Sequence, residues 1–169
     1  MPLSMFDSSV PIFVRTLSTL KAILEKGAAH AQSKKIDESV FLQARLYPDM
    51  YPLTHQVQIA TDMARGGAAR LAGAEPPKFE DNEQKFAELI ARVDRTIAYI
   101  KSLPKAQFDG GETRSITRPV RGQPHTFTGT NYLQQAVLPN LYFHATTTYA
   151  ILRHNGVELG KADFLGQID

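Results

Sequence analysis

The sequence predicts an all-α fold, a four-helix bundle with a small hairpin or ordered loop between the third and fourth helices. Four stretches carry apolar residues at steps of three and four, which places them on one face of a helix. Residues 105–130 break this period and are too long for a structureless link. A length of 169 residues with 43% hydrophobic residues suits one domain, 1–169.

The first two predicted helices span 5–27 and 53–71. Apolar residues from Phe6 to Leu24 form the stripe of the first, and Gly27 is a plausible stop. The second carries Gly66 and Gly67, whose small size allows close approach of a neighbouring helix.

The third predicted helix runs from about Asp81, which resembles a capping box with Gln84, to Leu103 before Pro104. In the segment that follows, Ser, Thr and β-branched residues on both sides of 121–124 indicate a hairpin or an ordered loop. The fourth helix spans 131–155, with Gly156 as a left-handed stop and a short tail, 157–169.

Composition excludes several classes of function. The chain has no Cys, which excludes disulfide scaffolds, thiolate metal sites and cysteine nucleophiles and leaves His, carboxylate or amide groups as metal ligands. A formal net charge of +2 gives no field for nucleic acid or an anionic membrane, so neither is an expected partner. No targeting segment or membrane-spanning apolar run is visible, and we expect a soluble, cytoplasmic protein.

The fourth predicted helix carries polar residues in the middle of its apolar stripe. At about 100° per residue, Asn140, His144, Thr147 and Thr148 share this stripe with Leu133 and other apolar residues. Burying an amide and an imidazole without partners costs a few kcal/mol. We therefore expect an internal hydrogen-bond network, a metal or a ligand between the second and fourth helices.

On the second helix, Gln56 falls within the apolar stripe, whereas His55 falls near the opposite face with Asp62. A pocket of Gln56, Asn140, His144, Thr147 and Thr148 follows from this register. If the helix is rotated, His55 faces inward, two imidazoles meet and a divalent metal becomes reasonable. The alternatives are a satisfied core residue for His144 and a solvated position for His55.

A family resemblance supports the helical fold. Residues 138–144 and 149–156 resemble the last helix of the DinB/YfiT-like superfamily of bacterial proteins, in which a His-x-x-x-His pair precedes an Arg and a Gly. His144, Arg153 and Gly156 fall on the second His, the Arg and the Gly, and Asn140 stands where the first His belongs. The segment 51–73 and the tail 160–165 look like one branch of this superfamily, a domain of unknown function.

The resemblance implies a bundle whose second and fourth helices hold a divalent metal through three His, often nickel or zinc, in enzymes that include thiol-dependent transferases. In this chain the ligand set would be His144, Asn140 and, from the second helix, His55 or its neighbour Gln56, with nickel, zinc or manganese as the ion, so the His triad is degenerate. Bundles of this kind commonly pair, and we expect a homodimer.

Two hypotheses follow. The first and favoured one is a small-ligand-binding or structural protein, in which the interior polar pocket contains no metal. The second is a divalent-metal-dependent enzyme of thiol transferase or hydrolase type, in which the ion activates a thiol or water.

Overall fold

The computed structural model describes residues 4–167, so the ends of the predicted domain, 1–3 and 168–169, lie outside the described part. None of the helices within residues 4–167 has the length and apolar character needed to cross a membrane. In chain order the elements are α1 (Val10–Lys34), α2 (Glu38–Leu42), α3 (Leu53–Leu71), α4 (Phe86–Ser102), the 3-10 helix η1 (Lys105–Phe108), β1 (Ser115–Val120), β2 (Gln123–Thr128), α5 (Gly129–Asn131), the π-helix η2 (Tyr132–Val137), α6 (Leu138–His154) and α7 (Lys161–Leu165).

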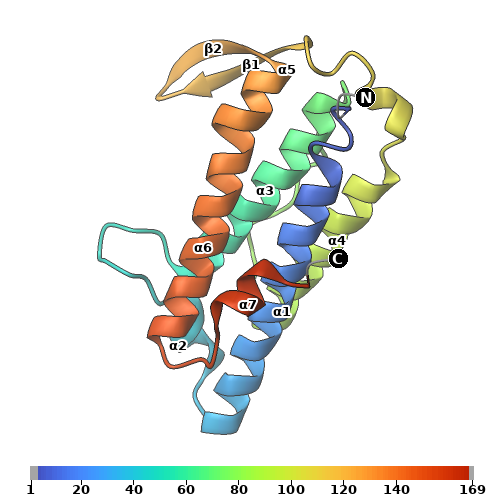
Figure 1. Cartoon of the computed structure of the whole chain (residues 1–169). Coiled ribbons are helices and arrows are strands. Elements are labelled where there is room, and N and C mark those ends of the chain that lie inside the picture. Colours follow the sequence, from blue (N-terminus) through green and yellow to red (C-terminus); the bar gives the residue numbers. More distant parts are fainter. Residues whose placement is uncertain (1–3, 168–169) are drawn as a thin grey trace.

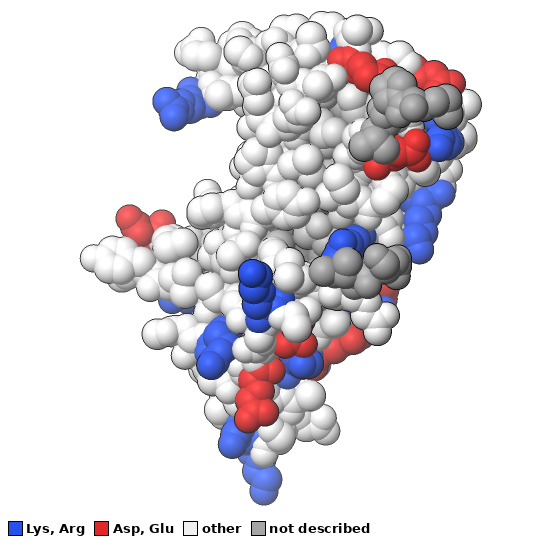
Figure 2. All heavy atoms as spheres, in the orientation of Figure 1, with Lys and Arg blue, Asp and Glu red and all other residues white. Residues whose placement is uncertain are grey.

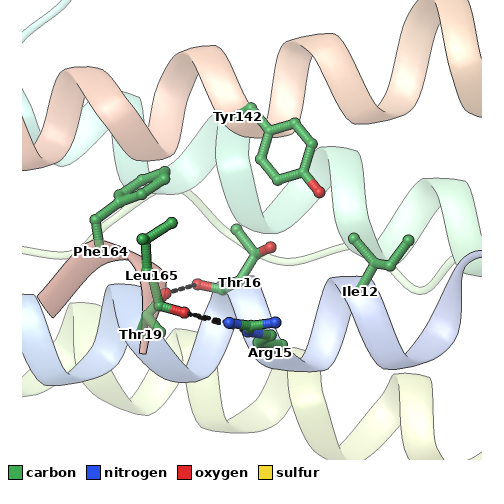
Figure 3. A pocket seen from close by; sticks show the side chains of 7 residues that line it. All are labelled: Ile12, Arg15, Thr16, Thr19, Tyr142, Phe164 and Leu165. Carbon is green, nitrogen blue, oxygen red and sulfur yellow. Dashed lines mark hydrogen bonds between the residues drawn. The ribbon is translucent and has the colours of Figure 1, made fainter. Parts of the chain in front are cut away.

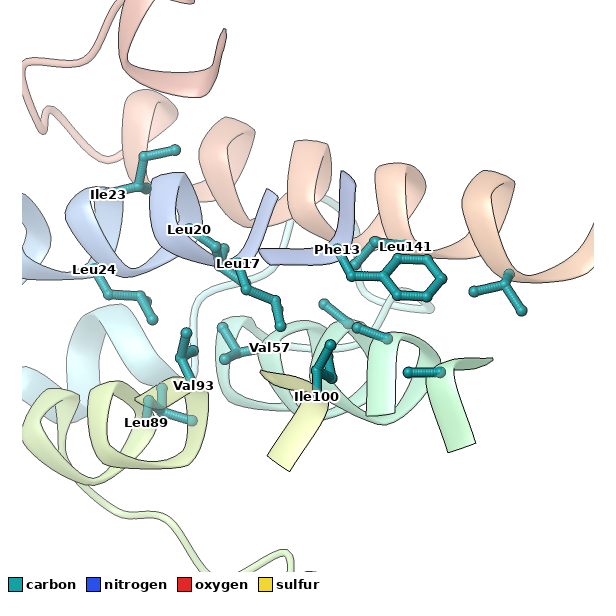
Figure 4. Close-up of a cluster of buried hydrophobic side chains, with 14 of the residues drawn as sticks. Phe13, Leu17, Leu20, Ile23, Leu24, Val57, Leu89, Val93, Ile100 and Leu141 are labelled. Atoms are coloured by element: carbon teal, nitrogen blue, oxygen red, sulfur yellow. The ribbon is translucent and has the colours of Figure 1, made fainter. Parts of the chain in front are cut away.

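Four long helices lie alongside one another, with α1 packed on α4 and α6, and α3 packed on α4 and α6 (Figure 1). Their apolar faces meet along a common axis, where Phe13, Leu17, Val57, Val93 and Leu141 are fully buried (Figure 4). Burying a side chain of this size stabilises the fold by about 1.5–3 kcal/mol. The core therefore holds α3 and α6, the two helices with the predicted site, side by side.

The segment between α4 and α6 contains the predicted hairpin. Strands β1 and β2 pair antiparallel, with Ser115 opposite Thr128 and Val120 opposite Gln123. The turn residues Arg121 and Gly122 both have positive φ, 49° and 80°, as a two-residue hairpin turn requires. The fold is therefore mostly helical with a small two-stranded sheet, so the all-α class is corrected while the hairpin predicted between the third and fourth helices is confirmed.

Several helix boundaries differ from the predicted ones. Helix α1 continues through Gly27 to Lys34, so Gly27 does not end it. Gly27 instead allows close packing, since a Cβ atom there would lie 3.1 Å from the Phe86 ring. Helix α4 begins at Phe86 rather than at Asp81. Asp81 instead pairs with Arg92, so the predicted capping box does not form. The stop at Gly156 is confirmed by its φ of 92°.

The C-terminal helix α7 lies across α1 near α6 (Figure 1). The Nη2 atom of Arg15 donates to the carbonyl oxygen of Leu165 at 2.7 Å, and this contact closes one side of a cavity of about 290 Å³ (Figure 3). Asp163 accepts from the backbone N–H of Gly160 at the start of α7, which caps this helix, and pairs with Lys26.

Candidate functional site

The predicted contact between the second and fourth helices forms through Gln56 on α3 and His144 on α6. His144 is 9% exposed, and its Nδ1 atom lies 2.6 Å from Oε1 of Gln56. The Gln56 amide nitrogen donates to the carbonyl oxygen of Tyr51 at 3.0 Å, so the amide oxygen is the atom that faces the ring. His144 must then carry its proton on Nδ1, and Nε2 keeps a free lone pair.

Burial lowers the pKa of His144, and the positive charge of a protonated His55 lowers it further. A lowered pKa keeps His144 neutral at neutral pH. The ring therefore acts as a hydrogen-bond donor at Nδ1 and as a potential base or ligand at Nε2.

His55, the residue before Gln56, is oriented by a glutamine in the same way as His144. It is half-buried, and its Nδ1 atom lies 2.9 Å from Oε1 of Gln58, whose amide nitrogen donates to Glu83 at 2.9 Å. The amide orientation again requires the proton on Nδ1 and leaves Nε2 free. The edge of the Tyr51 ring packs against the His55 ring, with 4.4 Å between the ring centroids.

From Gln58 the polar contacts continue into a buried ionic cluster around Arg92. The Arg92 side chain is fully buried and donates to Thr61 at 2.8 Å, to Glu83 at 3.0 Å and to Asp62 at 2.8 Å. Burial alone would raise the pKa of Glu83, but the hydrogen bonds from Gln58 and Arg92 outweigh it and lower this pKa. The cluster joins α3, α4 and the segment between them, and it fixes the orientation of the residues beside His55.

Arg92 was not predicted as a buried residue, because the apolar residues of α4 alone define its helical period. The detectable signal was a lone arginine inside the stripe formed by Leu89, Val93 and Ile100. Asp62, which the helical register placed on the face opposite the apolar stripe, binds the buried Arg92 and also Arg65, at 2.8 Å.

Asn140 does not join His144, and its predicted position on the core face is wrong. It is exposed, and its amide nitrogen donates to the carbonyl oxygen of Ala136 at 2.6 Å. The π-helical segment η2 precedes α6 and widens the turn, so the ideal 100° register drawn through Leu133 does not hold beyond it. In α6 the buried stripe instead contains Leu141, together with Ala145, Thr148 and Leu152.

Thr147 and Thr148 are buried as predicted, but their hydroxyl groups bond within their own helix. Thr147 donates to the carbonyl oxygen of Phe143 at 2.8 Å, and Thr148 donates to that of His144 at 2.9 Å. These bonds satisfy the two hydroxyls without a ligand. Of the predicted pocket residues, Gln56 and His144 therefore bind each other directly.

Asn140 lines a different cavity, a cleft of about 510 Å³ beneath the hairpin. The outline of the molecule is hollowed between the hairpin and the loop 43–52 (Figure 2). We call this cavity the hairpin cleft. Its walls come from α3, the hairpin, η2 and the start of α6, and they comprise Asp62, Met63, Arg70, Arg118, Pro119, Val120, His125, Phe127, Tyr132, Gln135, Ala136, Val137 and Asn140.

The imidazoles of His55 and His144 provide part of what a metal site requires. Within residues 4–167 no group of three or more His, Asp or Glu side chains is placed to hold an ion. Both imidazoles have the correct tautomer for a ligand, because a hydrogen bond at Nδ1 orients Nε2 outward. Two imidazoles alone fall short of the three protein ligands that catalytic zinc sites keep, so an ion held by them would need a further ligand from substrate or solvent.

Comparison with known proteins places the chain in a family. A model of the family described as "Domain of unknown function (DUF1993)" matches residues 5–165. The chain is similar to a DinB family member protein from Shewanella denitrificans of known crystal structure, with 43% identity, a TM-score of 0.90, and coverage of 96% of this chain and 92% of that one. No curated protein shows a significant match.

Proposed function

The chain belongs to the DUF1993 family, and from that premise we propose that it is a small-molecule-binding protein with a degenerate metal site on a DinB-like four-helix bundle. Its ligand occupies the hairpin cleft, between α3, η2 and the β1–β2 hairpin. The sequence predicts a ligand in the interior, between α3 and α6. The hairpin cleft also lies against α3 and the start of α6, but on the outer side of their contact.

The cleft itself carries the proposal. Its volume of about 510 Å³ lies within the range of roughly 300–1,000 Å³ that small-molecule sites occupy. Aromatic and aliphatic side chains such as Phe127, Tyr132 and Val137 form one part of the wall, and polar side chains form the rest. An apolar wall with a few oriented polar groups is the usual composition of a ligand pocket.

A neutral fluorescent probe, N-phenyl-1-naphthylamine, tests the location. The natural chain has no Trp, so a single introduced indole reports on one place only. Val120 lines the cleft and Val40 lies on α2 at the opposite end of the molecule, and both are exposed enough to accept a larger side chain. We expect saturating probe to quench the tryptophan of Val120→Trp by energy transfer and to leave that of Val40→Trp nearly unchanged. Equal quenching in both variants, or none in either, would refute the location.

The metal-dependent enzyme remains the second candidate, and one observation favours it. His144 and His55 each anchor Nδ1 on a glutamine oxygen and keep Nε2 free, which is how ligating imidazoles are held. An ion bound between them would activate water or a thiol of the substrate. Protein purified without a His tag should then contain nickel, zinc or manganese near stoichiometry and lose it in His144→Ala. Substoichiometric metal that this variant leaves unchanged would remove the enzyme hypothesis.

A further inference from the structure

The hairpin cleft has basic groups on two of its sides. Arg70 reaches it from α3, and Arg118 and His125 reach it from the hairpin. Arg118 and His125 are directly opposite each other in the β1–β2 register, so their side chains project from the same face of the hairpin. Phe127, two residues from His125, shares this face and is buried. The inward face of the hairpin is thus apolar near α5 and basic toward the turn.

The one carboxylate in the cleft wall does not neutralise these groups. Asp62 already binds Arg92 and Arg65, each at 2.8 Å. Within the described residues, neither Arg70 nor Arg118 forms an ion pair with a carboxylate. The cleft therefore offers uncompensated positive charge beside an apolar wall.

Arg70 is held in place rather than extended into solvent. Its Nη1 atom lies 3.3 Å from the hydroxyl oxygen of Tyr132, and its guanidinium lies against the backbone of its own helix at Gly66, where a Cβ atom would collide with it. The side chain is half-buried. A guanidinium held in one position loses less conformational entropy when it binds an anion than a free side chain does.

Arg70 and Arg118 also line a second cavity, of about 330 Å³, which Arg114 enters from the segment before β1. The two arginines thus stand between this cavity and the cleft. The carboxylate in the wall of this second cavity is that of Glu75. Three guanidinium groups against one carboxylate make this end of the cleft positive.

We infer that the hairpin cleft binds an organic anion with an apolar body. A carboxylate or phosphate group would bind Arg70 and Arg118 through charge-assisted hydrogen bonds, and an aromatic or aliphatic body would pack against Phe127 and Val137. The inference rests on the proposed function, because it specifies the class of ligand for the same cleft.

Two probes that share one ring system separate charge from apolar burial. 1-Anilinonaphthalene-8-sulfonate carries an anionic group, and N-phenyl-1-naphthylamine is the same ring system without it. We expect the anionic probe to bind the natural protein more tightly. Arg118→Gln and Arg70→Gln should each weaken it by about tenfold, the loss of roughly one charge-assisted hydrogen bond, and leave the neutral probe unchanged. Arg121→Gln is the matched control, because Arg121 lies in the same hairpin outside the cleft wall and should affect neither probe.

The outcomes distinguish the two proposals. If the neutral probe does not bind in the cleft, the proposed function fails. If it binds there but the anionic probe binds no more tightly, or is insensitive to both arginine variants, the anion inference alone is refuted. Displacement of the anionic probe by 1-naphthoate or by 1-naphthyl phosphate identifies the preferred anion and supports the inference. Equal displacement by the neutral 1-naphthol would overturn it.

Discussion

Two adjacent glycines on α3 give a matched pair of substitutions with opposite expected outcomes. A Cβ atom at Gly67 would lie 2.6 Å from Cγ1 and 3.2 Å from Cγ2 of Val137 on η2, in the fully packed core. At Gly66 the added atom would meet the guanidinium of Arg70, which rotation about its side-chain bonds can move away at the cost of its hydrogen bond to Tyr132. The pair therefore compares a rigid obstacle with a movable one at neighbouring positions of one helix.

The magnitudes follow from two effects. Replacing Gly by Ala in a helix interior stabilises by about 1 kcal/mol at either position. At Gly67 the new methyl must also move about 1 Å or more to reach ordinary carbon–carbon contact, and overpacking of this kind costs about 1–3 kcal/mol. Gly67→Ala should therefore lower the free energy of unfolding by up to about 2 kcal/mol, whereas Gly66→Ala should leave it unchanged or raise it by up to about 1 kcal/mol.

Urea unfolding followed by far-UV circular dichroism measures both variants, since the chain has no Trp to report fluorescence. A double-mutant cycle with Val137→Ala adds an internal control, because the smaller side chain removes the obstacle and should make Gly67→Ala less costly. Two outcomes would contradict this explanation: Gly67→Ala is as stable as Gly66→Ala, or Val137→Ala does not change the destabilisation that Gly67→Ala causes. The close approach of η2 to α3 would then not be the reason why residue 67 must be small.

Three further predictions concern the polar residues. Arg92→Met removes the partner of a buried carboxylate and should cost about 3–5 kcal/mol of unfolding free energy in urea titrations, whereas the mostly exposed Arg95→Met should cost less than about 0.5 kcal/mol; similar costs would contradict the cluster. NMR titration should give His144 a pKa below about 6.5, and His55→Gln should raise it. Because the unfolded chain then binds this proton first, stability that His144 contributes is present above about pH 6.5 and is lost as pH falls from there toward the lower folded pKa. Asn140→Ala should change the free energy of unfolding by less than about 0.5 kcal/mol, and a loss above about 1 kcal/mol would mean that Asn140 belongs to a buried network after all.

The helical parts of the fold were predictable because burial imposes a short repeat on the sequence. The period of the apolar residues predicted the observed bounds of α3, and the residues around 121–124 indicated a hairpin or an ordered loop, of which the structure shows the hairpin. The start of α4 was placed too early, because the acidic residue that resembled a cap, Asp81, binds a distant side chain instead. Local patterns cannot distinguish a carboxylate that caps a helix from one that pairs across the fold.

The candidate site was predictable only in part. The pairing of Gln56 with His144 follows from two polar residues on facing apolar stripes, and the structure shows it. The position of Asn140 could not be derived, because η2 changes the helical register by an amount that a fixed 100° step ignores. The hairpin cleft was missed because its basic wall joins residues from α3 and from the hairpin that lie far apart in the chain.

The sequence by itself determined the apolar stripes of the long helices, the helix end at Gly156, and that any metal would need nitrogen or oxygen ligands, since these depend on residue type and short spacing alone. The tertiary structure decided which polar groups meet. Arg92 is stable in the core only because carboxylates from two segments surround it, and Arg70 and Arg118 share a cleft only because the hairpin folds over α3. Contacts of this kind depend on how elements distant in the chain pack together, and no local repeat encodes that arrangement.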